Sequence, residues 1–115
     1  MLFRSRQAEL LGDLPPEVAD QKLWAELFLG GISFYGVEWE TSILFFRELC
    51  PAAPFFQNAC DRLVTALVAL ADQNAARGEW CPAEPLYAEA FQQDNQPEIA
   101  DKLALARQEI GRAHV

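Results

Sequence analysis

The sequence is poor in histidine and cysteine, the usual ligands of structural zinc, and this shortage argues against a zinc site. Its one histidine, His114, is next to the last residue, and Cys50, Cys60 and Cys81 form no Cys-x-x-Cys pair. A structural zinc site needs four ligands at short spacing. We therefore expect no metal, and we expect the three cysteines to be buried thiols that act as small hydrophobic groups.

Catalytic motifs are missing as well. The chain has no Ser/His/Asp set and no His-Glu-x-x-His motif, and Gly30-Gly31 has no following lysine and no preceding strand to make a phosphate-binding loop. None of the arrangements that mark an active site can be assembled from these residues. The sequence therefore predicts a protein that is not an enzyme and that binds no cofactor.

Positive charge is scarce, which limits the possible partners. Nine basic residues stand against 17 acidic ones, and the formal net charge is −8. Such a surface repels a phosphate backbone. The apolar runs are also too short to cross a bilayer, and no apolar leader follows Arg4 and Arg6. We expect no nucleic-acid partner, no membrane insertion and a cytoplasmic location.

Apolar side chains at helical spacing are what the chain does have. Hydrophobic residues make up 51% of its 115 residues, enough for the core of a single domain covering residues 1–115. Breaks at glycine and proline separate five predicted helices. The expected ranges are from about Asp13 to just before Gly36, then 38–49, 55–76, 81–93, and from Pro97 to Gly111.

Several local signals set these boundaries. Cys50-Pro51 is expected to end the second helix, because the residue before a proline is pushed out of helical geometry. Pro82 and Pro85 are placed in the first turn of the fourth helix, where proline is tolerated. Gly30-Gly31 lies inside the first helix and marks either a break or a close backbone approach, of which we favour the close approach.

A repeated Glu-Trp pair suggests that one helical unit is used twice. Trp39 and Trp80 lie 41 positions apart, and laying residues 23–56 over 64–97 matches small with small residues and aromatic with aromatic. Ser42 then meets Ala83, and Phe46 meets Tyr87. We expect glycine to allow the turn and the acidic residue to suit the next helix N-terminus. Both tryptophans are expected to be core residues at the helix junction.

The second unit resembles a tetratricopeptide repeat (TPR), a helix–turn–helix of 34 residues with a sparse pattern of small and large positions. Leu70-Ala71 matches the family's Leu-Gly pair, Gly78-Glu79-Trp80 its turn, and Ala83, Tyr87 and Ala90 its packing positions. The first unit, 23–56, fits less well, and seven extra residues separate the units. The resemblance implies a right-handed array of antiparallel helix hairpins, closed by a capping helix at about 98–111.

The resemblance also implies a concave groove lined by the first helix of each unit. The matching positions include Gly31, Thr65, Ala75 and Ala76, and the candidate partner-binding residues are Trp24, Leu27, Phe34, Tyr35, Val68 and Asp72. The family's chaperone-tail clamp needs lysine and asparagine here, so we expect no such clamp. Large apolar side chains left open usually mark an interaction site. The alternative is that residues 1–22 fold over them and make them core.

The function expected from these features is non-catalytic protein interaction, with an apolar helix or peptide segment of another protein held in the groove. Three alternatives remain open. The chain could be a small acidic secretion-type chaperone for one exported protein, a homodimer that buries its aromatic surplus, or a regulatory adaptor for an enzyme complex. Loss of binding without loss of stability in a Trp24→Ala/Tyr35→Ala variant would favour the groove over the core interpretation.

Overall fold

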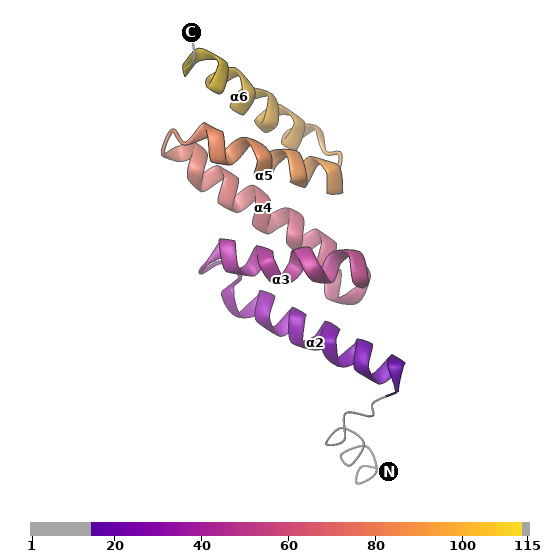
Figure 1. The fold of residues 1–115 in the computed structure, drawn as a ribbon. Coiled ribbons are helices and arrows are strands. Elements are labelled where there is room, and N and C mark those ends of the chain that lie inside the picture. The colour runs from indigo at the N-terminus through magenta and orange to yellow at the C-terminus, as the bar shows by residue number, and fades with distance from the viewer. Residues whose placement is uncertain (1–14, 114–115) are drawn as a thin grey trace.

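The computed structural model describes residues 15–113, and this part of the chain is entirely helical, as predicted. Successive helices turn back on one another to form hairpins (Figure 1). The helices are α2 (Pro16–Phe34), α3 (Trp39–Ala52), α4 (Ala59–Ala76), α5 (Trp80–Gln93) and α6 (Pro97–Ala113), and a short 3-10 turn, η1 (Phe56–Asn58), precedes α4.

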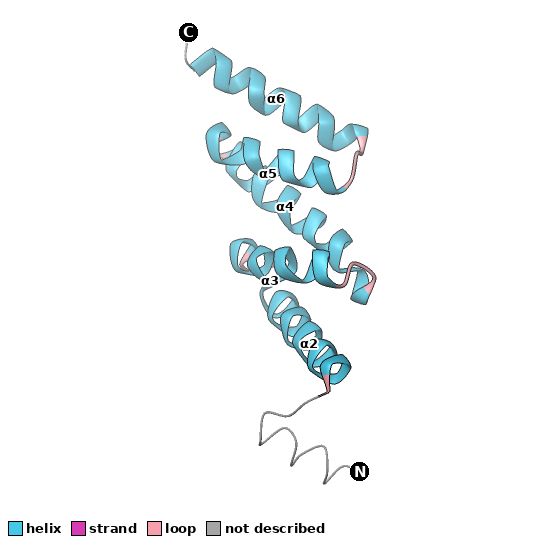
Figure 2. Ribbon diagram, turned by 45° about the vertical axis from the view of Figure 1, so that its right-hand side comes forward, coloured by secondary structure: helices cyan, strands magenta, loops and turns pink. Residues whose placement is uncertain are grey.

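The helices are arranged in a row. Each packs chiefly on the helix before it and the helix after it in the chain. Figure 2 shows the same order from a second side, with only short loops between the helices. Stacked helices of this kind stabilise one another through nearest-neighbour contacts.

The repeated Glu-Trp pair marks two equivalent helix starts. Helix α3 begins at Trp39 and α5 at Trp80, and both helices are 14 residues long. Before them, Gly36 and Gly78 have φ of +80° and +77°, a backbone conformation that glycine adopts without strain. The expected glycine turn before each second helix is therefore confirmed, although both helices start one residue away from the predicted positions.

Two proline predictions are wrong. Helix α3 continues through Pro51 to Ala52, and the amide of Ala53 still donates to the Leu49 carbonyl at 2.8 Å. Pro85 lies well beyond the first turn of α5, inside the helix. Proline has a helical φ, so it costs mainly one hydrogen bond and a local clash. Both helices nevertheless continue through their proline.

Other boundaries differ too. The third predicted helix is broken at its start, because Gln57 and Asn58 have φ of 50° and 57°, and α4 begins only at Ala59. Helix α6 starts at Pro97 as predicted but continues past Gly111 to Ala113. Asp13, the predicted cap of the first helix, lies outside the described residues.

The core runs along the row of helices. One cluster joins α2, α3 and the first half of α4 around Phe46, Leu49, Leu63 and Leu67, and it includes one residue each of α5 and α6, Ala90 and Ile99. A second joins α4, α5 and α6 around Ala83, Tyr87 and Leu103. Trp39 and Trp80 are half-buried at the edges of these two clusters. They pack on the core, as expected, without being enclosed by it.

The two adjacent glycines allow α2 and α3 to touch. A Cβ on Gly31 would lie 2.6 Å from the ring of Phe46, and one on Gly30 would lie 2.5 Å from the ring of Phe45. The approach is fixed by Ser42, which is fully buried and donates its hydroxyl to the Gly31 carbonyl at 2.7 Å. The predicted close approach at Gly30-Gly31 is confirmed.

The two glycines should respond differently to alanine. Phe46 is fully buried and has no room to move, so Gly31→Ala is expected to lower the free energy of unfolding by about 1–3 kcal/mol through overpacking. Phe45 is only half-buried and can shift, so in Gly30→Ala the gain in helix propensity of about 1 kcal/mol offsets the displacement. Urea unfolding of both variants measures the difference. Equal losses would contradict the packing.

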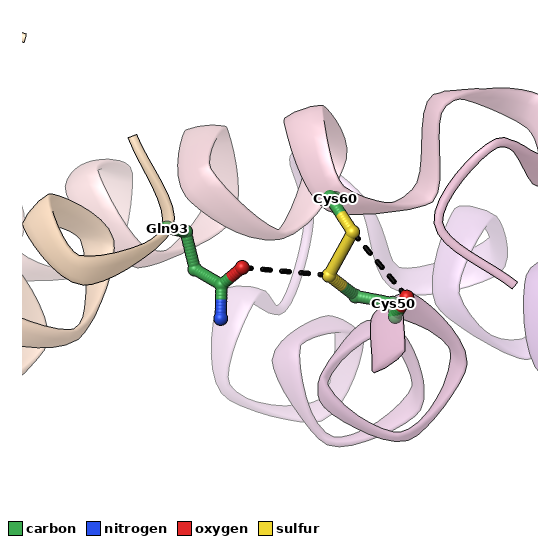
Figure 3. The surroundings of a disulfide bond; sticks show 3 residues. All are labelled: Cys50, Cys60 and Gln93. Atoms are coloured by element: carbon green, nitrogen blue, oxygen red, sulfur yellow. Dashed lines mark hydrogen bonds between the residues drawn. A yellow bond between two sulfur atoms is a disulfide. The ribbon is translucent and has the colours of Figure 1, made fainter. Parts of the chain in front are cut away.

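Cysteine pairing is a further correction. Cys50, near the end of α3, is bonded to Cys60, in the first turn of α4 (Figure 3). Cys81 is exposed. The prediction of three buried thiols is therefore wrong. Gln93 Oε1 lies 3.6 Å from Cys50 Sγ, and Cys60 Sγ lies 3.4 Å from the Cys50 carbonyl oxygen. A disulfide sulfur carries no hydrogen, so these contacts would become hydrogen bonds only in the thiol form.

Candidate functional site: a groove between α4 and α6

A groove of about 560 Å³ separates α4 from α6. Its size is within the range of pockets that bind small ligands or a few side chains. Helix α4 supplies one wall and α6 the other, and the loop between α5 and α6 closes one end. The lining residues are Asp61, Val64, Thr65, Val68, Ala69 and Asp72 from α4, Asp94 and Gln96 from the loop, and Glu98, Ile99 and Lys102 from α6.

The groove combines apolar and acidic side chains. Val64 and Val68 are half-buried on α4, and Ile99 of α6 is 4% exposed. Carboxylates lie beside them on both walls. The arrangement offers apolar contact area together with several hydrogen-bond acceptors, and it offers only one cationic group, Lys102.

Asp72 holds the two walls at a fixed distance. Its carboxylate accepts hydrogen bonds from Lys102 Nζ at 3.0 and 3.2 Å and from the hydroxyl of Tyr87, so it connects α4 with both α5 and α6. Burial raises the pKa of Tyr87, and the hydrogen bond to Asp72 raises it further. Tyr87 therefore stays protonated and acts as a donor at any ordinary pH.

The repeat relates this contact to the glycine contact in the first unit. Asp72 and Tyr87 occupy the positions that Gly31 and Phe46 occupy one repeat earlier, and in both units the pair joins the first helix to the second. In the first unit the ring meets bare backbone. In the second unit a carboxylate at the glycine position reaches the ring hydroxyl and also faces the groove.

Of the six predicted partner-binding residues, Val68 and Asp72 line the groove. Thr65, another matched position, lines it as well, whereas Ala75 and Ala76 are not among the lining residues. These three predicted positions therefore share the face of α4 that lines the groove, whereas the predicted groove also included residues of α2. A role for these residues in binding stays a prediction.

The four residues predicted on α2 have separate surroundings. Leu27 is 8% exposed and belongs to the core. Phe34 stacks on Phe45 of α3, with ring centroids 6.3 Å apart. Trp24 packs on Phe56, and Tyr35 packs edge-on against Trp39 at 4.9 Å. The four side chains therefore do not form a single open patch.

Trp24 and Tyr35 belong instead to an aromatic stripe, with Phe28, that faces the start of α4. Arg62 of α4 lies over two of its rings, with the guanidinium carbon 5.4 Å from the Phe28 ring centre and 5.6 Å from that of Tyr35. Such cation–π contacts add to packing. Residues 16–22, one of the segments considered as a cover, form the first turns of α2 itself, and residues 1–14 lie outside the described part.

The sequence analysis missed the α6 wall and its loop. Asp94, Glu98, Ile99 and Lys102 were assigned to a capping helix and its turn, with no part in a site. One signal was available. A capping helix that follows two hairpins stands where the first helix of a third unit would stand, so its inner face continues the groove surface.

No protein-family model, curated protein or solved structure matches this chain. The resemblance to TPR proteins therefore stays a prediction.

Two further findings concern the described part of the chain. Within residues 15–113, no three or more His, Cys, Asp or Glu side chains gather in a way that could hold a metal ion. None of the helices found there is both long and apolar enough to span a membrane.

Proposed function

We propose that this chain is a non-catalytic interaction module that binds a peptide segment of another protein in the groove between α4 and α6. The observation that supports it most directly is the lining of the groove by two helices that are not consecutive in the chain, with an apolar floor and exposed polar groups. TPR-like stacking of hairpins would account for such a surface. A secretion-type chaperone is the same function restricted to one exported client.

A blocking substitution inside the groove tests this function. Thr65 is exposed and lines the groove, so Thr65→Arg should obstruct it and pair with Asp61 one turn away, at little cost to stability. Gln73→Arg is the matched control, because Gln73 is exposed on the same helix, receives the same charge and is not among the lining residues.

The probe is a phage library of random dodecapeptides, selected on the wild-type protein. We expect the selected peptides to bind the wild type and Gln73→Arg equally. Their affinity for Thr65→Arg should be at least roughly tenfold lower. Equal binding to all three proteins would place the peptide site elsewhere. A selection that enriches no peptide would remove the proposed function.

Self-association is the second candidate, because several large apolar side chains are exposed. Leu44 on α3 is 62% exposed, and Phe55 just before η1 is 80% exposed. Light scattering on the same three proteins at high concentration measures it. A mass equal to the monomer's 12.9 kDa would remove this candidate.

The expected cytoplasmic location is also a proposal. Disulfides persist in oxidising compartments and are rare in the reducing cytosol. The Cys50–Cys60 bond therefore weighs against the cytoplasm and favours an oxidising compartment. The binding function proposed above does not depend on which of the two is correct.

A further inference from the structure

The charges around the groove are unbalanced, and this imbalance suggests what binds there. Four carboxylates, those of Asp61, Asp72, Asp94 and Glu98, line the groove together with a single amine, that of Lys102. The one amine is already engaged, since Lys102 and Asp72 form an ion pair at 3.0 Å. Three carboxylates are therefore left without a cationic partner in the groove.

The local contacts of these three carboxylates confirm that they face solvent uncompensated. Asp94 accepts a hydrogen bond from the neutral amide of Gln96 at 2.6 Å. Asp61 and Glu98 have no hydrogen bond or ion pair within the described residues. An apolar floor with carboxylates on both sides favours a ligand that is itself both apolar and cationic.

The arginines of the described residues are engaged elsewhere, so none of them neutralises the groove. Arg47 makes a two-point ion pair with Glu89, at 2.9 and 2.8 Å, which joins α3 to α5 and raises the pKa of Arg47. Arg62 covers the aromatic stripe and donates to the Gln57 carbonyl. The remaining three pair with Glu79, Glu84 and Glu109.

We propose that the groove takes a partner segment that carries lysine or arginine between apolar residues, with its basic side chains against the carboxylates that line the groove, those of Asp61, Asp94 and Glu98, and its apolar side chains on Val64, Val68 and Ile99. This inference rests on the proposed function and specifies its partner. In a groove that binds a terminal carboxylate, the protein supplies the cations and the ligand supplies the carboxylate. Here the protein supplies the carboxylates and the ligand supplies the cations.

Charge also argues against a second copy of the chain as the occupant. Each copy carries a formal charge of −8, so two copies repel each other over distances of about a Debye length, roughly 10 Å at 0.1 M salt. A basic segment is attracted by the same field, and its association is accelerated. The occupant is therefore a segment of a different, locally basic protein.

The test begins with the sequences of the dodecapeptides selected on the wild-type protein. We expect them to be enriched in lysine and arginine relative to the unselected library. The tightest peptide is then synthesised with each Lys and Arg replaced by Gln, and fluorescence anisotropy should show roughly tenfold weaker binding for each charged contact that is lost.

Paired variants locate the effect. Asp61→Asn/Glu98→Gln should lose the preference for the cationic peptide over its Gln analogue. Glu40→Gln/Glu48→Gln is the matched control, because it removes the same charge from exposed positions on α3, outside the groove, and it should keep the preference. Circular dichroism melts check that both variants are folded.

Three outcomes overturn the inference. Selected peptides without basic enrichment, or a Gln analogue that binds as tightly as its parent, leave a binding groove with no charge selectivity, and the proposed function then stands alone. Equal losses in both paired variants indicate diffuse attraction to an acidic protein. An empty selection removes the proposed function and this inference with it.

Discussion

Replacement of Phe46 by alanine is expected to lower the free energy of unfolding by about 3–5 kcal/mol, the usual range for a buried phenylalanine. The ring is fully buried at the centre of the α2–α3 packing. It packs edge-on against Phe28 at 6.3 Å and Tyr35 at 6.0 Å, and it lies against Gly31. Alanine would leave a cavity that these groups cannot fill without moving both helices. The loss is a large part of the stability of a typical domain, about 5–15 kcal/mol.

The control for this prediction lies two residues earlier on the same helix. Leu44 is 62% exposed, so Leu44→Ala should change the free energy of unfolding by less than about 0.5 kcal/mol. Urea titration monitored by circular dichroism gives both values. A loss below about 1 kcal/mol for Phe46→Ala would mean that the ring is not enclosed as described.

Breaking the disulfide is expected to produce the second largest effect. The bond closes a loop with a sequence separation of 10, and constraint of the unfolded chain by such a loop contributes about 2–3 kcal/mol. It also holds the connection that contains the left-handed residues Gln57 and Asn58. Cys50→Ala/Cys60→Ala should unfold at a lower urea concentration by the corresponding amount.

Reductant and a thiol count provide the controls. A strong phosphine reductant should destabilise the wild type and Cys81→Ala alike, and should leave the double variant unchanged. The unfolded, oxidised wild type should titrate with one free thiol, that of Cys81. Three free thiols in protein purified without reductant would show that the bond does not form.

The sequence predicted the existence of the five helices better than the residues at which they begin and end. Apolar spacing reports which residues face a core, and all five helices follow from it. Pro51 was predicted to break its helix and Pro85 to lie in a first turn, yet a proline inside a helix costs about 3 kcal/mol. Tertiary packing around Leu49 and Tyr87 can supply that amount, and the local pattern gives no sign of it.

The sequence predicted only a minor part of the candidate site. Val68 and Asp72, which were predicted from matched repeat positions on α4, do line the groove. Phe34 and Tyr35 were predicted to share one groove, but α2 ends at Phe34 and the backbone of Tyr35 is already extended, so Phe34 reaches Phe45 whereas Tyr35 packs on Trp39. The disulfide could not be chosen among three cysteines, because the pairing depends on where α3 and α4 meet.

The single-file order of the helices has a consequence for the groove. Helix α6 packs mainly on α5 and ends the row, so its detachment exposes less core than the opening of any interior helix. The groove needs α6 in place, since Glu98, Ile99 and Lys102 form one wall. Ligand capture and local melting of the C-terminal helix are thus linked equilibria. A segment present at 100 times its dissociation constant would raise the free energy needed to detach α6 by about 2.7 kcal/mol.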